Sequence, residues 1–504
     1  MKDIYKMMKD DSALFVLGVA IFIFVYIFFA QVHPIVIFDG DDWNYLSNFR
    51  NALPAWGKWN PSRVFPEVLA PLSGYFSAYF TILFVNNYLY AFTVTVAFLL
   101  AVFMLAFYWS FIKYIKNYNS LNQSCLFFLG ILLIALYFGL FKSQKFNNLY
   151  MLYSTNFICI FYYVLPSLLN AILVLYLASD KQNSKTDLKR TYLGKGVIFI
   201  AFYLAIFSNL FSSCILAVYC FSRLLLRWMH EKERSFSQIK TILMQEKICF
   251  YTVIFWLISL LFETSGGNAS KLEAGASYFY LPIAKTLAQF GMLVRQLNKG
   301  WLALILVTLV IAGIIYNKSK EVTQLERKYK DESLVLWFSA ILTLVFLILL
   351  CAKVGPEYAN RIQSMFGWFF YLTMVFFVSG VYILSKVPKV AMLLPILVLV
   401  MAVSVTNSNQ HYIEAMIGNH VPKECLAVDE AIIRQVQEAE RLGQKNMVLK
   451  VPKGDNKDNW PHPFYMGKNI SRTLLAHGII SHDIKIKIQP DPAMNKEYYR
   501  QEMR

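Results

Sequence analysis

Charged residues are scarce in this sequence. They make up 16% of the 504 residues, whereas an ordinary soluble domain carries about 25%. Hydrophobic residues reach 57% and the mean hydropathy is +0.46, which excludes a soluble globular protein. Aromatic residues, which are counted in that 57%, make up 16% of the chain, too much burial for an intrinsically disordered protein. The composition therefore predicts a protein that lies within a membrane.

The sequence also lacks the motifs of several other protein classes. It contains neither G-x-x-x-x-G-K-[ST] nor G-x-G-x-x-G, which argues against a nucleotide bound on the inner side of the membrane. No H-E-x-x-H or C-x-x-C spacing is present, and most cysteines lie in or beside apolar runs, where they are expected to be small buried hydrophobes. The net charge of +17 comes largely from short loops between apolar runs, so no nucleic-acid partner is predicted.

Long apolar runs dominate the first 410 residues. A window of about 20 residues, the length that crosses roughly 30 Å of hydrocarbon, predicts about eleven transmembrane helices. The runs 196–207 and 211–226 are short, and form either a tight helical hairpin or one long broken helix. The predicted spans are 13–32, 82–112, 124–141, 157–178, 196–207, 211–226, 248–262, 301–316, 333–352, 366–385 and 389–406.

The distribution of basic residues predicts the orientation of these spans. With the hairpin, the basic segments 181–195, 223–247 and 318–330 all fall on one side of the membrane, which the positive-inside rule identifies as the cytoplasm. The amino terminus is then cytoplasmic, while the long first loop 33–81 and the tail 411–504 face outward. The composition suggests the cytoplasmic (inner) membrane of a bacterium.

The tail 411–504 has the composition of a small water-soluble domain. Residues 428–442 have helical spacing of apolar positions, and Gly443 is a natural stop for that helix. Residues 447–451 read as a strand ended by Pro452, and Ile484, Ile486 and Ile488 alternate with lysines as in a half-buried strand. We therefore predict an extracytoplasmic α/β domain after a transmembrane domain of residues 1–410.

Three aspartates follow the first span within four residues. Asp39, Asp41 and Asp42 repel one another and are unfavourable near a membrane surface, so they predict a bound cation, a shared proton or the activation of a substrate hydroxyl. A structural alternative is that Asp41 or Asp42 caps a helix that begins near Trp43. The loop beyond them interleaves aromatic residues such as Trp59 with prolines, which predicts interfacial anchoring, a surface for a lipid chain, or both.

Three stretches carry a resemblance to a known family. They are the acidic motif directly after the first span, the segment Trp59-Asn60-Pro61-Ser62-Arg63, and the segment Gly266-Gly267-Asn268-Ala269-Ser270-Lys271. Together with the many spans and the soluble tail, they make the chain resemble the bacterial GT-C superfamily of polytopic membrane glycosyltransferases. The second stretch departs from the pattern of those relatives, because Pro61 and Ser62 stand where a glycine is expected.

The resemblance implies a reaction and roles for individual residues. Such enzymes transfer a sugar from a polyprenyl-phosphate carrier to a hydroxyl of a cell-surface glycan or glycolipid, generally with inversion. Asp41 or Asp42 would be the general base, Asp41 first, with the other carboxylate or Asp39 orienting the acceptor or raising the pKa of the base. The relatives that use a monophosphate carrier commonly need no metal, so no obligatory metal or other cofactor is predicted, although closely spaced aspartates suit a divalent cation.

The same implied reaction produces a phosphate leaving group, which basic residues would stabilise. Each candidate has the alternative of an ordinary contact with lipid headgroups. The candidates for donor phosphate binding are Arg63, Arg361, Lys271 and Lys353, and the candidates for acceptor or lipid contact are Trp43, Trp59 and Glu67.

Two other functions remain open at this stage. A transporter or flippase of lipid-linked sugars is also many-spanning, but the spans contain few ionisable residues and the acidic cluster lies at one surface. A polymerase or ligase of lipid-linked glycans shares the large outward loops. In the tail, Trp460 suits either stacking on a sugar ring or a simple turn with a docked aromatic.

Overall fold

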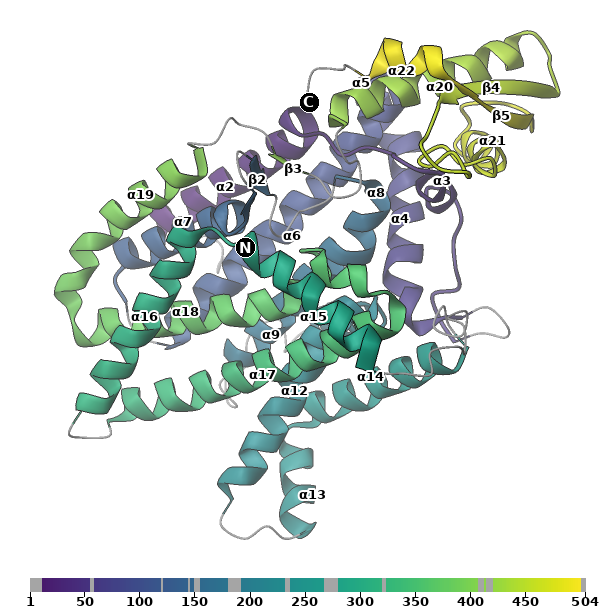
Figure 1. Ribbon diagram of the computed structural model, residues 1–504. Coiled ribbons are helices and arrows are strands. Elements are labelled where there is room, and N and C mark those ends of the chain that lie inside the picture. Colours follow the sequence, from purple (N-terminus) through teal and green to yellow (C-terminus); the bar gives the residue numbers. More distant parts are fainter. Residues whose placement is uncertain are drawn as a thin grey trace.

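The computed structural model is mostly helical, with a small α/β region at its carboxyl-terminal end (Figure 1). It describes residues 11–54, 59–118, 121–143, 146–148, 155–179, 192–231, 236–266, 280–319, 323–406, 412–413 and 420–499. The helices of the larger part are α2 (Ser12–Ile27), α3 (Gly40–Tyr45), α4 (Val64–Phe76), α5 (Ile82–Val85), α6 (Tyr88–Tyr118), α7 (Gln123–Gly139), α8 (Phe157–Cys159), α9 (Leu165–Ser179), α11 (Tyr192–Ile206), α12 (Leu210–His230), α13 (Phe236–Gln245), α14 (Lys247–Gly266), α15 (Tyr280–Arg295), α16 (Lys299–Lys318), α17 (Gln324–Val354), α18 (Phe366–Lys386) and α19 (Leu394–Thr406).

Asparagine side chains begin many of these helices. Asn122 caps α7 by accepting a hydrogen bond from the Cys125 amide, and Asn209 and Asn298 cap α12 and α16 in the same way. Each asparagine satisfies a backbone amide that has no partner within its helix. Asn209 therefore separates α11 from α12, and α11 contacts α9 and α14, which also pack against α12. The apolar stretch 196–226 is two helices and not one long helix.

The number of helices that can cross a membrane is smaller than predicted. Eight helices in the described part of the chain are long and apolar enough, or nine if α13 and α14, which meet at a bend of 93°, form one span. All eleven predicted runs are helical, but α7, α11 and the helix over Pro388–Val403 are shorter than a full span. The prediction of about eleven spans is therefore corrected to eight or nine. The chain is a multi-pass membrane protein embedded in a lipid bilayer.

The long first loop 33–81 was also predicted incorrectly in its second half. Residues Pro61–Val85 form a nearly continuous helical segment of 25 residues, made of η2 (Pro61–Arg63), α4, the π-helix η3 (Ser77–Thr81) and α5. The prolines of this stretch indicated a loop, but Pro61 and Pro66 lie at helical starts, where the missing amide costs little. Only Pro71 lies within the helix.

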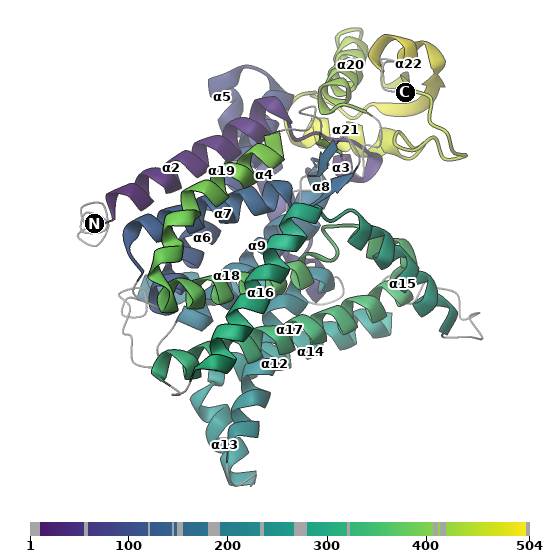
Figure 2. The same cartoon turned by 60° about the vertical axis from the view of Figure 1, so that its left-hand side comes forward.

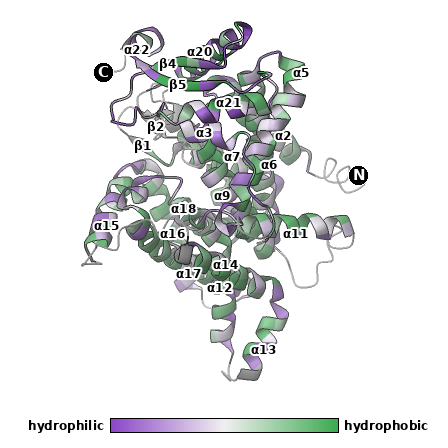
Figure 3. Ribbon diagram, turned by 90° about the vertical axis from the view of Figure 1, so that its right-hand side faces the viewer, coloured by the Kyte–Doolittle hydropathy of each residue, from purple (hydrophilic) through white to green (hydrophobic). Residues whose placement is uncertain are grey.

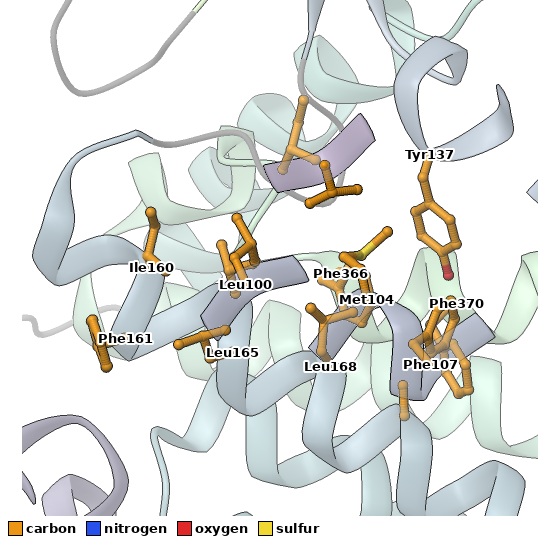
Figure 4. Packing of buried hydrophobic residues seen from close by; sticks show 14 of the residues in the cluster. Leu100, Met104, Phe107, Tyr137, Ile160, Phe161, Leu165, Leu168, Phe366 and Phe370 are labelled. Carbon is orange, nitrogen blue, oxygen red and sulfur yellow. The ribbon is translucent and has the colours of Figure 1, made fainter. Parts of the chain in front are cut away.

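Aromatic and aliphatic side chains fill the space between the helices. Figure 4 shows Leu100, Met104 and Phe107 of α6 near Leu168 of α9 and Phe370 of α18. Phe107 meets Tyr137 of α7 edge to face, with ring centroids 5.5 Å apart, and such pairs are favourable beyond their burial. This core fixes the helix ends that bound the candidate site.

The carboxyl-terminal region contains α20 (Pro422–Arg441), β4 (Asn446–Pro452), α21 (Met466–Ala476), β5 (Lys485–Asp491) and α22 (Pro492–Tyr498). Strands β4 and β5 are parallel, with Leu449 opposite Ile488, and α21 lies between them in the chain. The predicted helix and both predicted strands are confirmed, and Gly443 follows the helix with a φ of +67°. In Figure 3 this region carries more hydrophilic residues than the helices below it.

A second, small sheet joins the two parts. It consists of β1 (Lys142–Ser143), β2 (Phe146–Asn148) and β3 (Tyr412–Ile413), with β1 antiparallel and β3 parallel to β2. The carboxyl-terminal region itself rests on the acidic turn, because α21 packs against α3 (Figure 2). Thr473 donates a hydrogen bond to the Trp43 carbonyl, at 2.6 Å.

Candidate functional site

One cavity brings together residues from seven separate segments of the chain. It has a volume of about 430 Å³ and lies where α3, η2, the start of α12 and the ends of α14 and α17 meet. Its charged lining consists of three carboxylates and three cations, namely Asp39, Asp41, Glu263, Arg63, Lys353 and Arg361. Five of these six are candidate site residues of the sequence analysis.

Asp39 begins the short helix of the acidic turn. Its Oδ1 atom accepts hydrogen bonds from the amides of Asp41 and Asp42, at 2.9 and 3.2 Å, and the Asp39 amide donates in return to Asp42 Oδ2. This reciprocal arrangement is a capping box. The expectation that Asp41 or Asp42 caps a helix near Trp43 was therefore wrong by a few residues, because the helix begins at Gly40 and Asp39 is its cap.

Asp42 is fully buried and its carboxylate is occupied by protein groups. Its Oδ2 atom accepts from the Phe38 amide at 2.7 Å and from Asn156 Nδ2 at 2.7 Å, while Oδ1 accepts from the Ile158 amide at 2.8 Å. Burial and the neighbouring Asp39 raise the pKa of Asp42 well above its ordinary value, against the lowering effect of these amides. Asp42 does not line the cavity, so its carboxylate holds the acidic turn against the start of α8.

Asp41, in contrast, is exposed and lines the cavity. Its carboxylate accepts a long hydrogen bond of 3.4 Å from Tyr465 Oη of the carboxyl-terminal region. Most of its lone pairs are therefore available to a ligand. Of the three aspartates, Asp41 is the one whose geometry suits proton transfer to or from a bound molecule.

Asp39 has an unusual acidity for a carboxyl group beside this cavity. Burial, and after it the negative charge of Asp41, raise its pKa from 3.8 to about 6. Hydrogen bonds from the Asp42 and Asp41 amides, and from the side chain of Trp460, partly oppose the shift. Asp39 consequently changes its charge near neutral pH, next to the exposed Asp41.

Arg63 is held at the cavity by a buried carboxylate. Glu67, one turn farther along α4, accepts from Arg63 Nη1 at 3.3 Å and from Tyr162 Oη at 2.7 Å, and forms an ion pair with Arg50. Glu67 is 3% exposed and does not line the cavity. It lies where it orients Arg63, and not where a substrate would contact it.

Glu263 is a lining carboxylate that was not among the candidate residues predicted from the sequence. Its Oε2 atom accepts a hydrogen bond of 2.6 Å from Ser62 Oγ, which connects the end of α14 to η2. The Ser62 amide also donates to the side chain of Asn60, the cap of η2, at 3.0 Å. Ser62 therefore has a role in placing Arg63, at the position where the family pattern has a different residue.

The other two cations of the lining come from a later part of the chain. Lys353 lies in the last turn of α17, and Arg361 follows η6 (Pro356–Asn360). The Arg361 guanidinium lies 4.3 Å from the centroid of the Tyr358 ring, which itself stacks on Phe211 of α12. Lys271, the fourth predicted cation, lies outside the described residues.

The two predicted tryptophan contacts lie away from the cavity lining. Trp43 is fully buried beneath α21. Trp59 packs edge to face against Phe207 and Phe262, at centroid distances of 5.4 and 5.9 Å. Both indoles are placed to support the walls of the site, and neither is among the residues that line it.

Several lining residues gave no signal in the sequence. Tyr162 and Tyr163 fall within a predicted span as ordinary apolar aromatics, and Asn209 falls between two predicted spans. Their presence at the cavity follows from the π-helical turn η4 (Ile160–Val164) and from the start of α12, and neither is visible in the periodicity.

The chemistry of the lining combines acceptors for protons with fixed positive charge. Asp41 can accept a proton, and Arg63, Lys353 and Arg361 can stabilise an anion such as a phosphate. Within the described ranges, no group of three or more histidine, cysteine or acidic side chains is arranged to hold a metal ion.

No family model, no curated protein and no solved structure matches the chain.

Proposed function

We propose that this protein is a membrane glycosyltransferase of the GT-C type, which moves a sugar from a polyprenyl-phosphate carrier to a hydroxyl of a cell-surface glycan or glycolipid. The observation that carries the proposal is the composition of the cavity, where the exposed carboxylate of Asp41 shares one space with Arg63, Lys353 and Arg361. A sugar transfer from a lipid phosphate needs both kinds of group at once.

In the proposed reaction, Asp41 takes the proton of the acceptor hydroxyl as its oxygen attacks the anomeric carbon. The bond from that carbon to the phosphate oxygen breaks, and the phosphate leaves with the bonding electrons. General base catalysis of this kind contributes about 10² to 10⁴ in rate. Asp42 is assigned a structural role, because its oxygens are taken by hydrogen bonds from residues 38, 39, 156 and 158.

The cations are assigned to the leaving phosphate. Arg63 and Arg361 have the planar guanidinium that can bind two phosphate oxygens together, and Lys353 adds a point charge. Glu67 and Tyr358 restrict the two guanidinium groups before any ligand binds, which lowers the entropic cost of phosphate binding. The proposal requires no metal ion for this step, because a monophosphate leaving group can be stabilised by these three cations.

The proposal is tested with the purified full-length protein in liposomes. A panel of polyprenyl-phosphate sugars is added with an extract of cell-envelope glycans, and consumption of each donor is followed by mass spectrometry. We expect one donor to be consumed, and the Asp41→Asn variant to lose at least about 10²-fold of the rate. Asp331→Asn, an exposed aspartate on α17 away from this cavity, is the matched control and should keep full activity.

A result of no consumption with any donor, or equal rates for wild type and Asp41→Asn, would contradict the proposal. If the same liposomes instead show carrier movement across the bilayer that stops in Asp41→Asn, the protein is a transporter of lipid-linked sugars.

A further inference from the structure

The carboxyl-terminal region contacts the acidic turn, and one contact reaches a carboxylate that lines the cavity. Tyr465, which directly precedes α21, has its Oη atom 3.4 Å from Asp41 Oδ1, although the two residues are 424 positions apart in the sequence. Within the described part of the chain, no other side chain forms a hydrogen bond to the Asp41 carboxylate. The orientation of Asp41 thus depends on a residue from the far end of the protein.

One edge of the Tyr465 ring packs against Gly40 of the acidic turn, although the residue is 56% exposed. A Cβ atom on Gly40 would lie 2.8 Å from Pro463 Cγ and 3.0 Å from Tyr465 Cε2, so only glycine allows this approach. Asn469 of α21 donates a hydrogen bond of 2.9 Å to the Gly40 carbonyl, so α21 also holds the acidic turn. These contacts place the Tyr465 ring next to the acidic turn, with its hydroxyl beside Asp41.

The hydroxyl of Tyr465 can act as a donor throughout the physiological range. Burial and the nearby charges of Asp41 and Asp39 raise its pKa to about 12, so it keeps its proton. It can occupy one lone pair of the Asp41 carboxylate and leave the others for an acceptor hydroxyl. The distance of 3.4 Å is long, as is common for catalytic hydrogen bonds before a substrate is bound.

We propose that Tyr465 is a positioning residue for the transfer, whose hydroxyl holds the Asp41 carboxylate at the cavity, so that the carboxyl-terminal region completes the site. The inference rests on the proposed function, because it assigns Asp41 as the base. It gives the carboxyl-terminal region a part in the chemistry through Tyr465, which no sequence motif indicates.

The test compares two tyrosine-to-phenylalanine variants of the full-length protein. Tyr465→Phe removes the hydroxyl beside Asp41, while Tyr79→Phe removes a hydrogen bond of 2.8 Å to the Ala476 carbonyl, which also joins the two parts of the protein but does not touch Asp41. With the donor identified in the liposome panel, we expect Tyr465→Phe to lower kcat about ten-fold, the scale of one hydrogen bond to a charged group, with KM for the donor unchanged. Tyr79→Phe should keep the wild-type kcat.

A second pair of variants shows whether Tyr465 acts through Asp41. In an Asp41→Glu background the longer side chain no longer depends on this hydroxyl, so adding Tyr465→Phe should lower kcat less than about two-fold. A ten-fold loss in both backgrounds, a wild-type kcat for Tyr465→Phe, or an equal loss in Tyr79→Phe would each overturn the inference. Full activity of Asp41→Asn would instead overturn the proposed function, and the inference with it.

Discussion

Asn156 Nδ2 lies 2.7 Å from Asp42 Oδ2, and this buried hydrogen bond joins the acidic turn to the start of α8. The neighbouring bridge between Val36 and Asn156 adds backbone pairing to the same junction. Asp42 and Asp41 are adjacent in the sequence, yet one carboxylate is enclosed by donors and the other is exposed at the cavity. Replacement of Asp42 should therefore lower the stability of the fold, whereas replacement of Asp41 should not.

Asp42→Asn is expected to destabilise the fold. An asparagine replaces one acceptor oxygen by an amide that faces the donors of Phe38, Asn156 or Ile158, and each buried donor left without a partner costs about 1–3 kcal/mol. We expect a clear fall in the thermal unfolding temperature of Asp42→Asn in detergent. Asp41→Asn should unfold within about 1 °C of wild type, since its side chain is exposed, and an equal loss of stability in both variants would contradict this division of roles.

Asp39→Asn is expected to change how stability depends on pH. The pKa of Asp39 is about 6 in the folded protein and 3.8 in its ordinary state, so the folded protein binds the proton more tightly and loses stability as pH rises from about 4 to about 6. Asparagine keeps the helix cap but carries no charge. The free energy of unfolding of the variant should rise relative to that of wild type by at most about 3 kcal/mol across this interval. Above it, the difference should stay constant. If the free energies of unfolding of wild type and variant differ by the same amount at every pH from 4 to 8, the pKa of Asp39 is not shifted.

Glu67→Gln is expected to weaken binding of the donor phosphate without removing a group that contacts it. The neutral amide no longer pairs with Arg50 and Arg63, so Arg63 loses its fixed position beside the cavity. We expect KM for the polyprenyl-phosphate sugar to rise about ten-fold, with a smaller change in kcat. Tyr162→Phe, which removes one neutral donor to Glu67, serves as the milder comparison and should change KM less.

The contact between the two parts of the protein should weaken in acid. Burial lowers the pKa of His477 to about 4, and its Nδ1 lies 2.7 Å from Tyr88 Oη. Because the ordinary pKa is 6.5, the stabilisation is complete above about pH 6.5 and is lost as the pH falls towards 4. The unfolding temperature of wild type should fall more between pH 7 and 5 than that of His477→Gln. His482→Gln replaces a half-buried histidine whose partners Glu440 and Gln444 lie in its own region, so it should behave like wild type. Identical pH curves for all three proteins would contradict the assignment.

Local patterns predicted the elements well where one physical rule dominates. The helix 428–442 and the strands 447–451 and 484–488 follow from apolar periodicity and from Gly443 and Pro452, and the structure confirms them. The helix over Pro61–Val85 was not predicted because its prolines indicate a loop, while the positions of Pro61 and Pro66 at helical starts depend on three-dimensional context. The predicted number of spans was too high because some apolar runs form helices that are too short to cross a membrane.

The charged residues of the candidate site could be predicted from the sequence, but the contacts that position them could not. Asp41, Arg63, Lys353 and Arg361 were chosen because their residue types suit the chemistry, and the fold brings them to one cavity. No sequence pattern indicates that Asp42 is enclosed by Asn156, since that contact joins residues 114 positions apart. The same holds for Tyr465, whose approach to the turn depends on the packing of Gly40.

The central claim is that the acidic turn faces the outer side of the membrane, where a lipid-linked donor would be met. A single cysteine at the exposed position Asn48, just after the turn, tests it in intact cells with a membrane-impermeant maleimide, because all seven native cysteines are buried. The account predicts labelling of Asn48→Cys from outside, while Lys389→Cys at the other predicted face is labelled only after the membrane is opened. Labelling of Asn48→Cys only in opened cells would place Asp41 in the cytoplasm and contradict the account.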